Sequence, residues 1–147
     1  MGVCMEYTKR RNLNRGYLKI EVWQRGMDLF DLAFRLAGSI ADFKLKSQFT
    51  DAAKSVSAIV AEGYGRRTLP EYLQFLYYAK GSLGETLARA CGLLRAKLIP
   101  AAGFEEFASL HYEIENKLRA LISSLGAKRG DGTWQDTLPD INNPLIH

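Results

Sequence analysis

The stretch that decides the fold is residues 68–97, TLPEYLQFLYYAKGSLGETLARACGLLRAK. It opens with a capping box, in which the Thr68 hydroxyl and the Glu71 carboxylate satisfy reciprocal backbone donors at the start of a helix, and Pro70 fits that first turn. Apolar residues then recur at nearly heptad spacing, namely Leu73, Leu76, Leu83, Leu87, Ala90 and Leu94. This pattern predicts one long amphipathic helix that continues to about Lys97.

Three further segments carry the same helical period, and almost nothing alternates with the period of two that a strand needs. They are residues 21–42, 45–63 and 104–125, the last closed by Gly126. Their apolar stripes are Trp23, Phe30, Phe34, Ala37 and Ile40 or Ala41 in the first; Phe49, Ala52, Ala53, Val56, Val60 and Gly63 in the second; and Phe107, Ile114, Leu118, Leu121 and Leu125 in the third. Because the predicted links are short, neighbouring helices must run antiparallel.

The sequence therefore predicts an all-α fold, an up-and-down antiparallel four-helix bundle over residues 18–126. Residues 1–17 are expected to form a basic, flexible N-terminal arm, and residues 127–147 an irregular C-terminal tail that is mobile or docks. Six acid–base pairs spaced four residues apart are expected on solvated helix faces. They are Glu21–Arg25, Asp31–Arg35, Glu62–Arg66, Glu85–Arg89, Glu113–Lys117 and Glu115–Arg119.

Composition narrows the class of protein. The 147 residues suit one domain, and 47% hydrophobic with 24% charged residues is the balance of a folded, soluble chain. Uncharged runs are too short to span a bilayer, and no apolar stretch follows the basic N-terminus as in a secretory signal. We therefore expect a cytoplasmic protein with no membrane partner, and we interpret Cys4 and Cys91 as reduced thiols.

The third helix carries more aromatic surface than one bundle core can cover. Tyr72, Phe75, Tyr77 and Tyr78, with Leu76, point almost all the way round it. A helix that is apolar on every side must be buried on every side, so we predict that Tyr72, Phe75, Tyr77 and Tyr78 belong to an interface with another subunit. The alternative is that the tyrosines lie at the core margin with their hydroxyls in water.

Motifs for catalysis or metal binding are not recognisable. The two histidines, His111 and His147, lack ligands at metal-binding spacing, no Gly-Lys-Ser or Gly-Lys-Thr phosphate loop occurs, and no Ser or Cys has an evident base partner. We expect a protein that is not an enzyme and has no catalytic residues, no metal and no cofactor.

Two basic features lie outside the predicted core. Their cations are Lys9, Arg10, Arg11, Arg15 and Lys19 before the first helix, and Arg66 and Arg67 after the second. These side chains could contact phosphates, with Tyr7, Tyr17 and Tyr64 as stacking surfaces. They could equally be a solubilising tail and a helix-end cation pair, with Arg66 paired to Glu62.

Residues 18–125 resemble the four-helix-bundle family of the 23S ribosomal-RNA intervening-sequence proteins, to which accessory variability proteins of diversity-generating retroelements are related. The residues that carry the resemblance are Val22-Trp23-Gln24, Ala61-Glu62-Gly63-Tyr64-Gly65-Arg66-Arg67, Phe75-Leu76, and Ala79-Lys80-Gly81-Ser82-Leu83 with Glu85. The resemblance implies a ring-like homopentamer without known catalytic activity that associates with RNA or DNA, and in the retroelement relatives with a reverse transcriptase. The family typically has a Gln followed by two arginines where this chain has Gln48-Phe49-Thr50, so two expected cations are missing.

The motif residues also have structural interpretations. Trp23 opens the first helix, and Gly63 and Gly65 allow positive φ in a tight reversal. Gly81 and Ser82 permit a close helix crossing, Glu62 can pair with Arg66 or cap a neighbouring helix, and Glu85 lies on the third helix. Our first hypothesis is a non-catalytic, homo-oligomeric bundle that binds RNA or a ribonucleoprotein. The alternative is a protein–protein adaptor or assembly scaffold that uses the aromatic helix and the tail containing Trp134.

Overall fold

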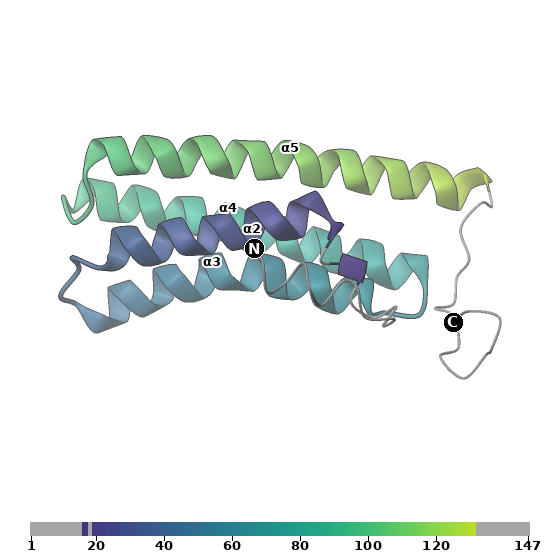
Figure 1. The fold of residues 1–147 in the computed structure, drawn as a ribbon, viewed down its shortest axis with the longest axis horizontal. Helices are drawn as coiled ribbons and strands as arrows, with labels where there is room; N and C mark the ends of the chain where they lie inside the picture. The colour runs from purple at the N-terminus through teal and green to yellow at the C-terminus, as the bar shows by residue number, and fades with distance from the viewer. Residues whose placement is uncertain (1–15, 18, 132–147) are drawn as a thin grey trace.

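The computed structural model describes residues 16, 17 and 19–131, and four helices make up most of this part of the chain (Figure 1). They are α2 (Glu21–Ala37), α3 (Phe43–Tyr64), α4 (Leu69–Arg95) and α5 (Ala101–Asp131). The described residues contain no strand. The predicted all-α class is confirmed.

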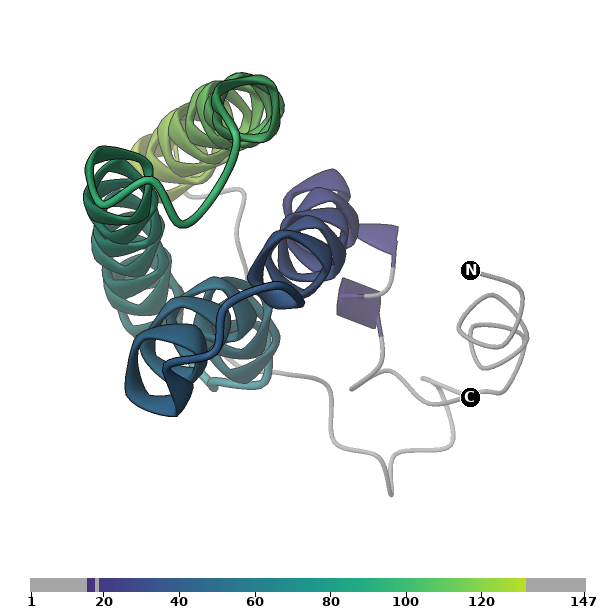
Figure 2. The same ribbon diagram turned by 90° about the vertical axis from the view of Figure 1, so that its left-hand side faces the viewer.

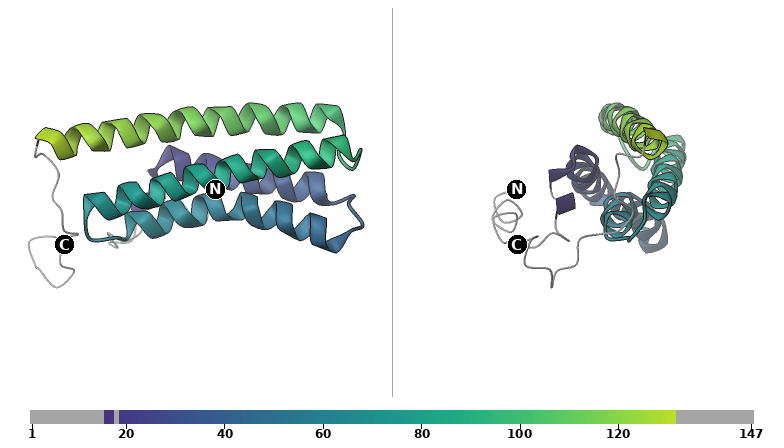
Figure 3. Two further views of the ribbon diagram at one scale, coloured as in Figure 1. Left: turned by 180° about the vertical axis from the view of Figure 1, so that it is seen from behind. Right: turned by 90° about the vertical axis from the view of Figure 1, so that its right-hand side faces the viewer.

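The helices run alternately up and down and form a four-membered ring when viewed end-on (Figures 2 and 3). Each helix contacts the next one in the chain, and α5 returns to contact α2. The α2–α5 contact is the least extensive of the four. The predicted antiparallel bundle is therefore confirmed for a single chain, with one side more open than the others.

The α3–α4 turn and the start of α2 lie at the same end of the bundle as the end of α5, and we call this the turn end (Figure 1). The links at residues 38–42 and 96–100 form the opposite end. None of the described helices combines the length and apolarity needed to cross a bilayer.

Side-chain caps fix where two of the helices begin. The backbone N–H of Glu71 donates to the Thr68 hydroxyl at 3.3 Å, as the capping box predicts, and the N–H of Leu45 donates to the Asp42 carboxylate at 3.0 Å. The second cap shows that one predicted boundary was wrong. The first helix ends at Ala37, and Asp42, which we expected to end it, instead starts α3.

The last helix is longer than predicted at both ends. It begins at Ala101 and continues through Gly126 to Asp131, so the expectation that Gly126 closes it was wrong, and residues 127–131 of the expected irregular tail are helical. A single glycine inside a helix costs only about 1 kcal/mol relative to alanine, and the good helix formers Ala127 and Lys128 follow it.

The core lies along the bundle axis and draws on all four helices. Its largest fully buried side chains are Phe49, Phe107, Leu29, Leu69, Leu76, Leu83, Ile114 and Leu118. Phe49 of α3 and Phe107 of α5 meet across the bundle with ring centroids 5.2 Å apart. Because burying one such side chain contributes about 1.5–3 kcal/mol, these residues supply a substantial part of the driving force for folding.

The apolar stripe of α2 is rotated from the predicted one. Leu29, Leu32 and Ala33 are buried, whereas Phe34 is 60% exposed and Phe30 is only partly buried. Two apolar stripes at helical spacing share this segment, so periodicity alone could not decide which one faces the core. Phe30 and Phe34 contact each other on the outside, with centroids 6.1 Å apart.

The absence of a side chain at Gly63 allows α3 and α4 to lie close together at the turn end. A Cβ atom placed on Gly63 would lie 2.5 Å from the Cβ of Phe75. Both atoms are attached directly to helical backbone, so neither could move without shifting a helix. Gly63 is therefore required by packing, and it lies within α3 rather than in a reversal with positive φ.

We expect Gly63→Ala to destabilise the protein by about 1–3 kcal/mol, because overpacking outweighs the better helix propensity of alanine. Urea unfolding followed by circular dichroism measures the difference at one protein concentration. Gly126→Ala is the matched control, since a Cβ there meets nothing within 4 Å, and it should stabilise by up to about 1 kcal/mol. Stabilisation of both variants would show that the close approach at Gly63 is unimportant.

Candidate functional site

The family motif at residues 61–67 lies at the turn end and includes the last residues of α3. Gly65 ends the helix with φ −78°, so the predicted positive φ at this glycine was wrong. Its backbone N–H donates to the carbonyl oxygens of Ala61 and Glu62 at 3.3 and 3.1 Å. The turn is thus an ordinary right-handed helix end, followed after Arg66 and Arg67 by the Thr68 cap of α4.

Four aromatic rings lie around this turn. Tyr17, just before α2, packs edge-on against Trp23 with ring centroids 5.4 Å apart and against Tyr64 at 6.4 Å. Tyr64 in turn packs edge-on against Tyr72 of α4 at 6.0 Å. The predicted motif residue Trp23 is buried. This aromatic cluster joins the segment before α2 to the α3–α4 turn, which is about 50 residues away in the sequence.

Cations from both predicted basic features lie in this region. The Arg66 guanidinium lies 4.5 Å from the centroid of the Phe75 ring and donates to the Glu62 carboxylate at 2.9 Å. Arg67 and Lys19 are exposed and form no ion pair with another described residue. The remaining predicted cations, Lys9, Arg10, Arg11 and Arg15, lie outside the described residues.

The predicted interface residues of α4 do not share one environment. Tyr72 is only 4% exposed and packs in its own core, so its assignment to an intersubunit surface was wrong. Burial raises the pKa of its hydroxyl. Tyr77 and Tyr78 are 54% and 53% exposed, and Phe75 is half-buried against Tyr78 at 5.6 Å. Only these three remain available to a partner.

The small motif residues of α4 differ in role. The Ser55 hydroxyl donates to Ser82 at 3.0 Å, which supports the predicted close contact between α3 and α4 at Ser82. A Cβ on Gly81 would meet nothing within 4 Å, so no crossing within the chain requires glycine there and that prediction was wrong. Glu85 accepts hydrogen bonds from Arg89, at 2.9 Å from Nη2.

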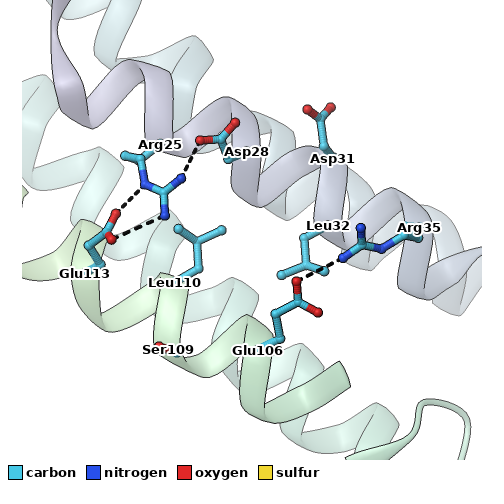
Figure 4. Close-up of a pocket in the computed structure, with 9 residues that line it drawn as sticks. All are labelled: Arg25, Asp28, Asp31, Leu32, Arg35, Glu106, Ser109, Leu110 and Glu113. Carbon is cyan, nitrogen blue, oxygen red and sulfur yellow. Dashed lines mark hydrogen bonds and ion pairs between the residues drawn. The ribbon is translucent and has the colours of Figure 1, made fainter. Parts of the chain in front are cut away.

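Charged side chains bridge the more open side of the bundle, between α2 and α5 (Figure 4). Arg25 hydrogen-bonds Glu113 and also Asp28 at 2.6 Å, and Arg35 pairs with Glu106 at 3.1 Å. The bond from Arg25 holds the pKa of the Glu113 carboxyl below its usual value. These residues line a cavity of about 460 Å³ whose cations are all paired.

Three of the six predicted acid–base pairs form, namely Glu62–Arg66, Glu85–Arg89 and Glu115–Arg119. The other three predicted pairs were wrong for the described structure, because residues on the facing helix take the place of the predicted partners. Glu21 pairs with Lys117 at 3.2 Å. Arg25 pairs with Glu113 of α5 and with Asp28 of its own helix, and Arg35 pairs with Glu106 of α5. Pairs this exposed contribute at most about 1 kcal/mol each.

A search for catalytic groups in the described part of the chain finds one buried histidine, and no cluster of three His, Cys, Asp or Glu side chains suited to a metal ion. His111 of α5 is 4% exposed, and its Nδ1 has no hydrogen-bond partner among the described residues. Burial lowers the pKa of His111, while Glu115 and the backbone of Leu83 partly oppose the shift. Because the ring is buried, we assign it to the core.

We expect His111 to make the folded state sensitive to mild acid. Its ring takes up a proton at the ordinary pKa of about 6.5 in the unfolded chain but only at lower pH in the folded chain. Stability should therefore be intact above pH 6.5 and fall as the pH drops from there towards the lowered pKa. Thermal melting from pH 7.5 to 5 measures the fall, which His111→Leu should largely remove. If His111→Leu keeps the parent's pH dependence, another titrating group causes the loss of stability. Glu113 is not such a group, because its lowered pKa places its titration below this pH range.

Sequence reasoning missed a second cationic and apolar region, at the opposite end of the bundle. Phe43 is 81% and Leu45 is 40% exposed, and they alternate with Lys44 and Lys46 at the start of α3. The signal was present in the sequence as two apolar residues that alternate with two lysines. Leu45 lies four residues before Phe49 on the same helix face, but Phe43 falls between the predicted helices 21–42 and 45–63, so its exposure at the start of α3 was not predicted.

Residues 18–120 match the protein family described as 23S rRNA-intervening sequence protein. The matched region is well over half of the chain and contains α2, α3, α4 and most of α5. No curated protein matches the chain.

Proposed function

The chain belongs to the 23S rRNA-intervening sequence protein family, and from that premise we propose that it is a non-catalytic, homo-oligomeric bundle that binds RNA or a ribonucleoprotein. The turn end of the bundle is the proposed RNA-binding surface. A reverse transcriptase with its template RNA, which the sequence resemblance implies for retroelement relatives, is one such ribonucleoprotein. The family's description supports a connection with ribosomal RNA and says nothing more specific.

The observation that carries this proposal is the contact between Tyr17 and Tyr64 at the turn end. It places the described residues just before α2 against the Arg66-Arg67 turn, although the two are far apart in the sequence. Arg15 is followed directly by Gly16, which lies so close to Tyr64 that an added Cβ would clash with the tyrosine ring. We propose that the N-terminal cations, which apart from Lys19 lie outside the described residues, join Arg66 and Arg67 at this surface.

This surface suits phosphate contacts better than base recognition. Arg67 and Lys19 are exposed and unpaired among described residues, which leaves their charge free for phosphates. Arg66 donates to Glu62 and lies over the Phe75 ring, and both contacts favour one orientation of its exposed guanidinium. The expected affinity is accordingly dominated by electrostatics, with little sequence preference.

Neutralising four of these cations, as Arg11, Arg15, Arg66 and Arg67→Gln, should weaken RNA binding. It should also reduce the slope of log K against log salt by at most about 3 for single strands, because each phosphate contact contributes about 0.7. Fluorescence anisotropy with a labelled RNA at several salt concentrations measures both effects.

The matched control neutralises four cations at the opposite end, as Lys44, Lys46, Arg95 and Lys97→Gln, and should leave RNA binding nearly unchanged. Equal loss in both variants would indicate that net charge alone matters. Parental binding by the turn-end variant would contradict the proposed surface.

Self-association, the second part of the proposal, is supported by the outer face of α4. Tyr77, Gly81, Gly84, Ala88 and Cys91 are all exposed and follow one another at steps of four and three residues. This is the spacing of a coiled-coil seam, and its small side chains permit close approach by another helix. A Cβ on Gly81 or Gly84 would meet nothing within 4 Å, so packing within the chain does not account for these glycines.

Gly84→Glu should reduce the mass of the assembly while stabilising the helix of the single chain, because glutamate is the better helix former. Multi-angle light scattering measures the mass, and Gly126→Glu on α5 is the control. An unchanged mass would exclude this face as the subunit contact, and a parent that is already monomeric would favour the adaptor hypothesis, with Tyr77 and Tyr78 left for another protein.

A further inference from the structure

A groove lies at the opposite end of the bundle, between the start of α3 and the end of α4. Its volume is about 260 Å³, which suits one large side chain, and its lining is Leu45, Gln48, Phe49, Arg89, Gly92, Leu93, Ala96 and Leu98. The lining is mainly apolar. A Cβ on Gly92 would meet nothing within 4 Å, so the space next to this glycine is open.

The rim of this groove is basic. Lys44 and Lys46 flank Leu45 in the sequence, and Arg95 and Lys97 flank Ala96. None of these four cations forms an ion pair with another described residue. The rim therefore favours an occupant that joins an apolar anchor to carboxylates.

The backbone at Lys97, just after the end of α4, adopts a left-handed conformation. Lys97 has φ 59°, in the left-handed region where a helix usually ends on glycine. The N–H of Leu98 donates to the carbonyl of Leu93 at 2.9 Å, which completes the helix end and brings Leu98 to the groove. Lys97 therefore occupies a position where glycine would be less strained, between two residues that line the groove, Ala96 and Leu98.

We propose that this groove binds the C-terminal segment, residues 132–147, of a second copy of the chain, with Trp134 as the anchor. The segment reads GTWQDTLPDINNPLIH. It contains apolar residues and two aspartates, Asp136 and Asp140, and neither Lys nor Arg. Its chemistry complements an apolar groove with a basic rim, and the segment lies beyond the matched residues 18–120.

Chain length selects a second copy over the same molecule. Helix α5 starts beside the groove and ends at Asp131, which at 1.5 Å per residue is about 45 Å away (Figure 1). Trp134 is three residues beyond Asp131 and reaches at most about 11 Å further. The anchor therefore cannot occupy the groove of its own chain. This docking is independent of RNA binding at the turn end.

The test uses full-length protein in which Trp23→Phe leaves Trp134 as the sole tryptophan. We expect Trp134 emission to move to shorter wavelength as protein concentration rises, because docking buries the indole. Gly92→Glu adds a carboxylate at the groove, where the added Cβ meets nothing within 4 Å, and should raise the concentration at half-shift at least about tenfold. Gly126→Glu, equally open and distant from the groove, should not.

A second measurement avoids substituting the buried Trp23. A fluorophore-labelled peptide of residues 132–147 is added to the otherwise unmodified chain, its Gly92→Glu variant and its Gly126→Glu variant. Binding to the parent and to Gly126→Glu, with at least about tenfold weaker binding to Gly92→Glu and weakening by salt, supports the proposal.

Three results would overturn it. They are an emission shift that does not depend on protein concentration, peptide binding that Gly92→Glu leaves intact, and the absence of both an emission shift and peptide binding. Loss of RNA binding in the variant lacking Lys44, Lys46, Arg95 and Lys97, together with no peptide binding, would assign the rim to RNA instead.

Discussion

The close approach of α3 and α4 at Gly63 is the constraint on which the turn end depends. Because no side chain separates the two helices there, Phe75 packs directly over the backbone of α3. Its ring then supports the Arg66 guanidinium, which also reaches back to Glu62 on the preceding turn. These two contacts favour one orientation of an arginine that is otherwise exposed.

The same packing positions Tyr64, and through it the residues just before α2. Tyr64 contacts Tyr72 on one side and Tyr17 on the other, and Tyr17 contacts the buried Trp23. Aromatic packing thus holds the segment before α2 against the α3–α4 turn, whereas the exposed ion pairs of α2 and α5 bridge the side of the bundle with the least extensive helix contact.

Local signals in the sequence were sufficient to predict the class of fold, the antiparallel order and the Thr68 cap. The rotation of α2 was not predictable in this way, because Leu29 and Leu32 compete with Phe30 and Phe34 at the same helical period, and only the surface offered by the other helices decides between them. Likewise the predicted partners of Arg25 and Arg35 were Glu21 and Asp31, one turn earlier. Both arginines instead pair with α5, and Arg25 pairs also with Asp28. Such choices depend on tertiary distances that periodicity does not contain. At the candidate site, the basic residues could be named from the sequence, whereas no motif indicates the packing of Tyr17 against Tyr64, which joins the segment before α2 to the α3–α4 turn.

The glycines of the chain separate two kinds of constraint that look alike in the sequence. Side chains at Gly26, Gly63 or Gly103 would collide with Ser57, Phe75 or Leu36, so folding of one chain explains these positions. Side chains at Gly81, Gly84, Gly92 or Gly126 would meet nothing, although each glycine weakens its helix by up to about 1 kcal/mol relative to alanine. Three of these four lie on α4, which also carries the exposed Tyr77 and Tyr78. Three glycines on the exposed side of α4 therefore lower the stability of this helix and do not improve its packing within the chain. We propose that contacts with another molecule account for them.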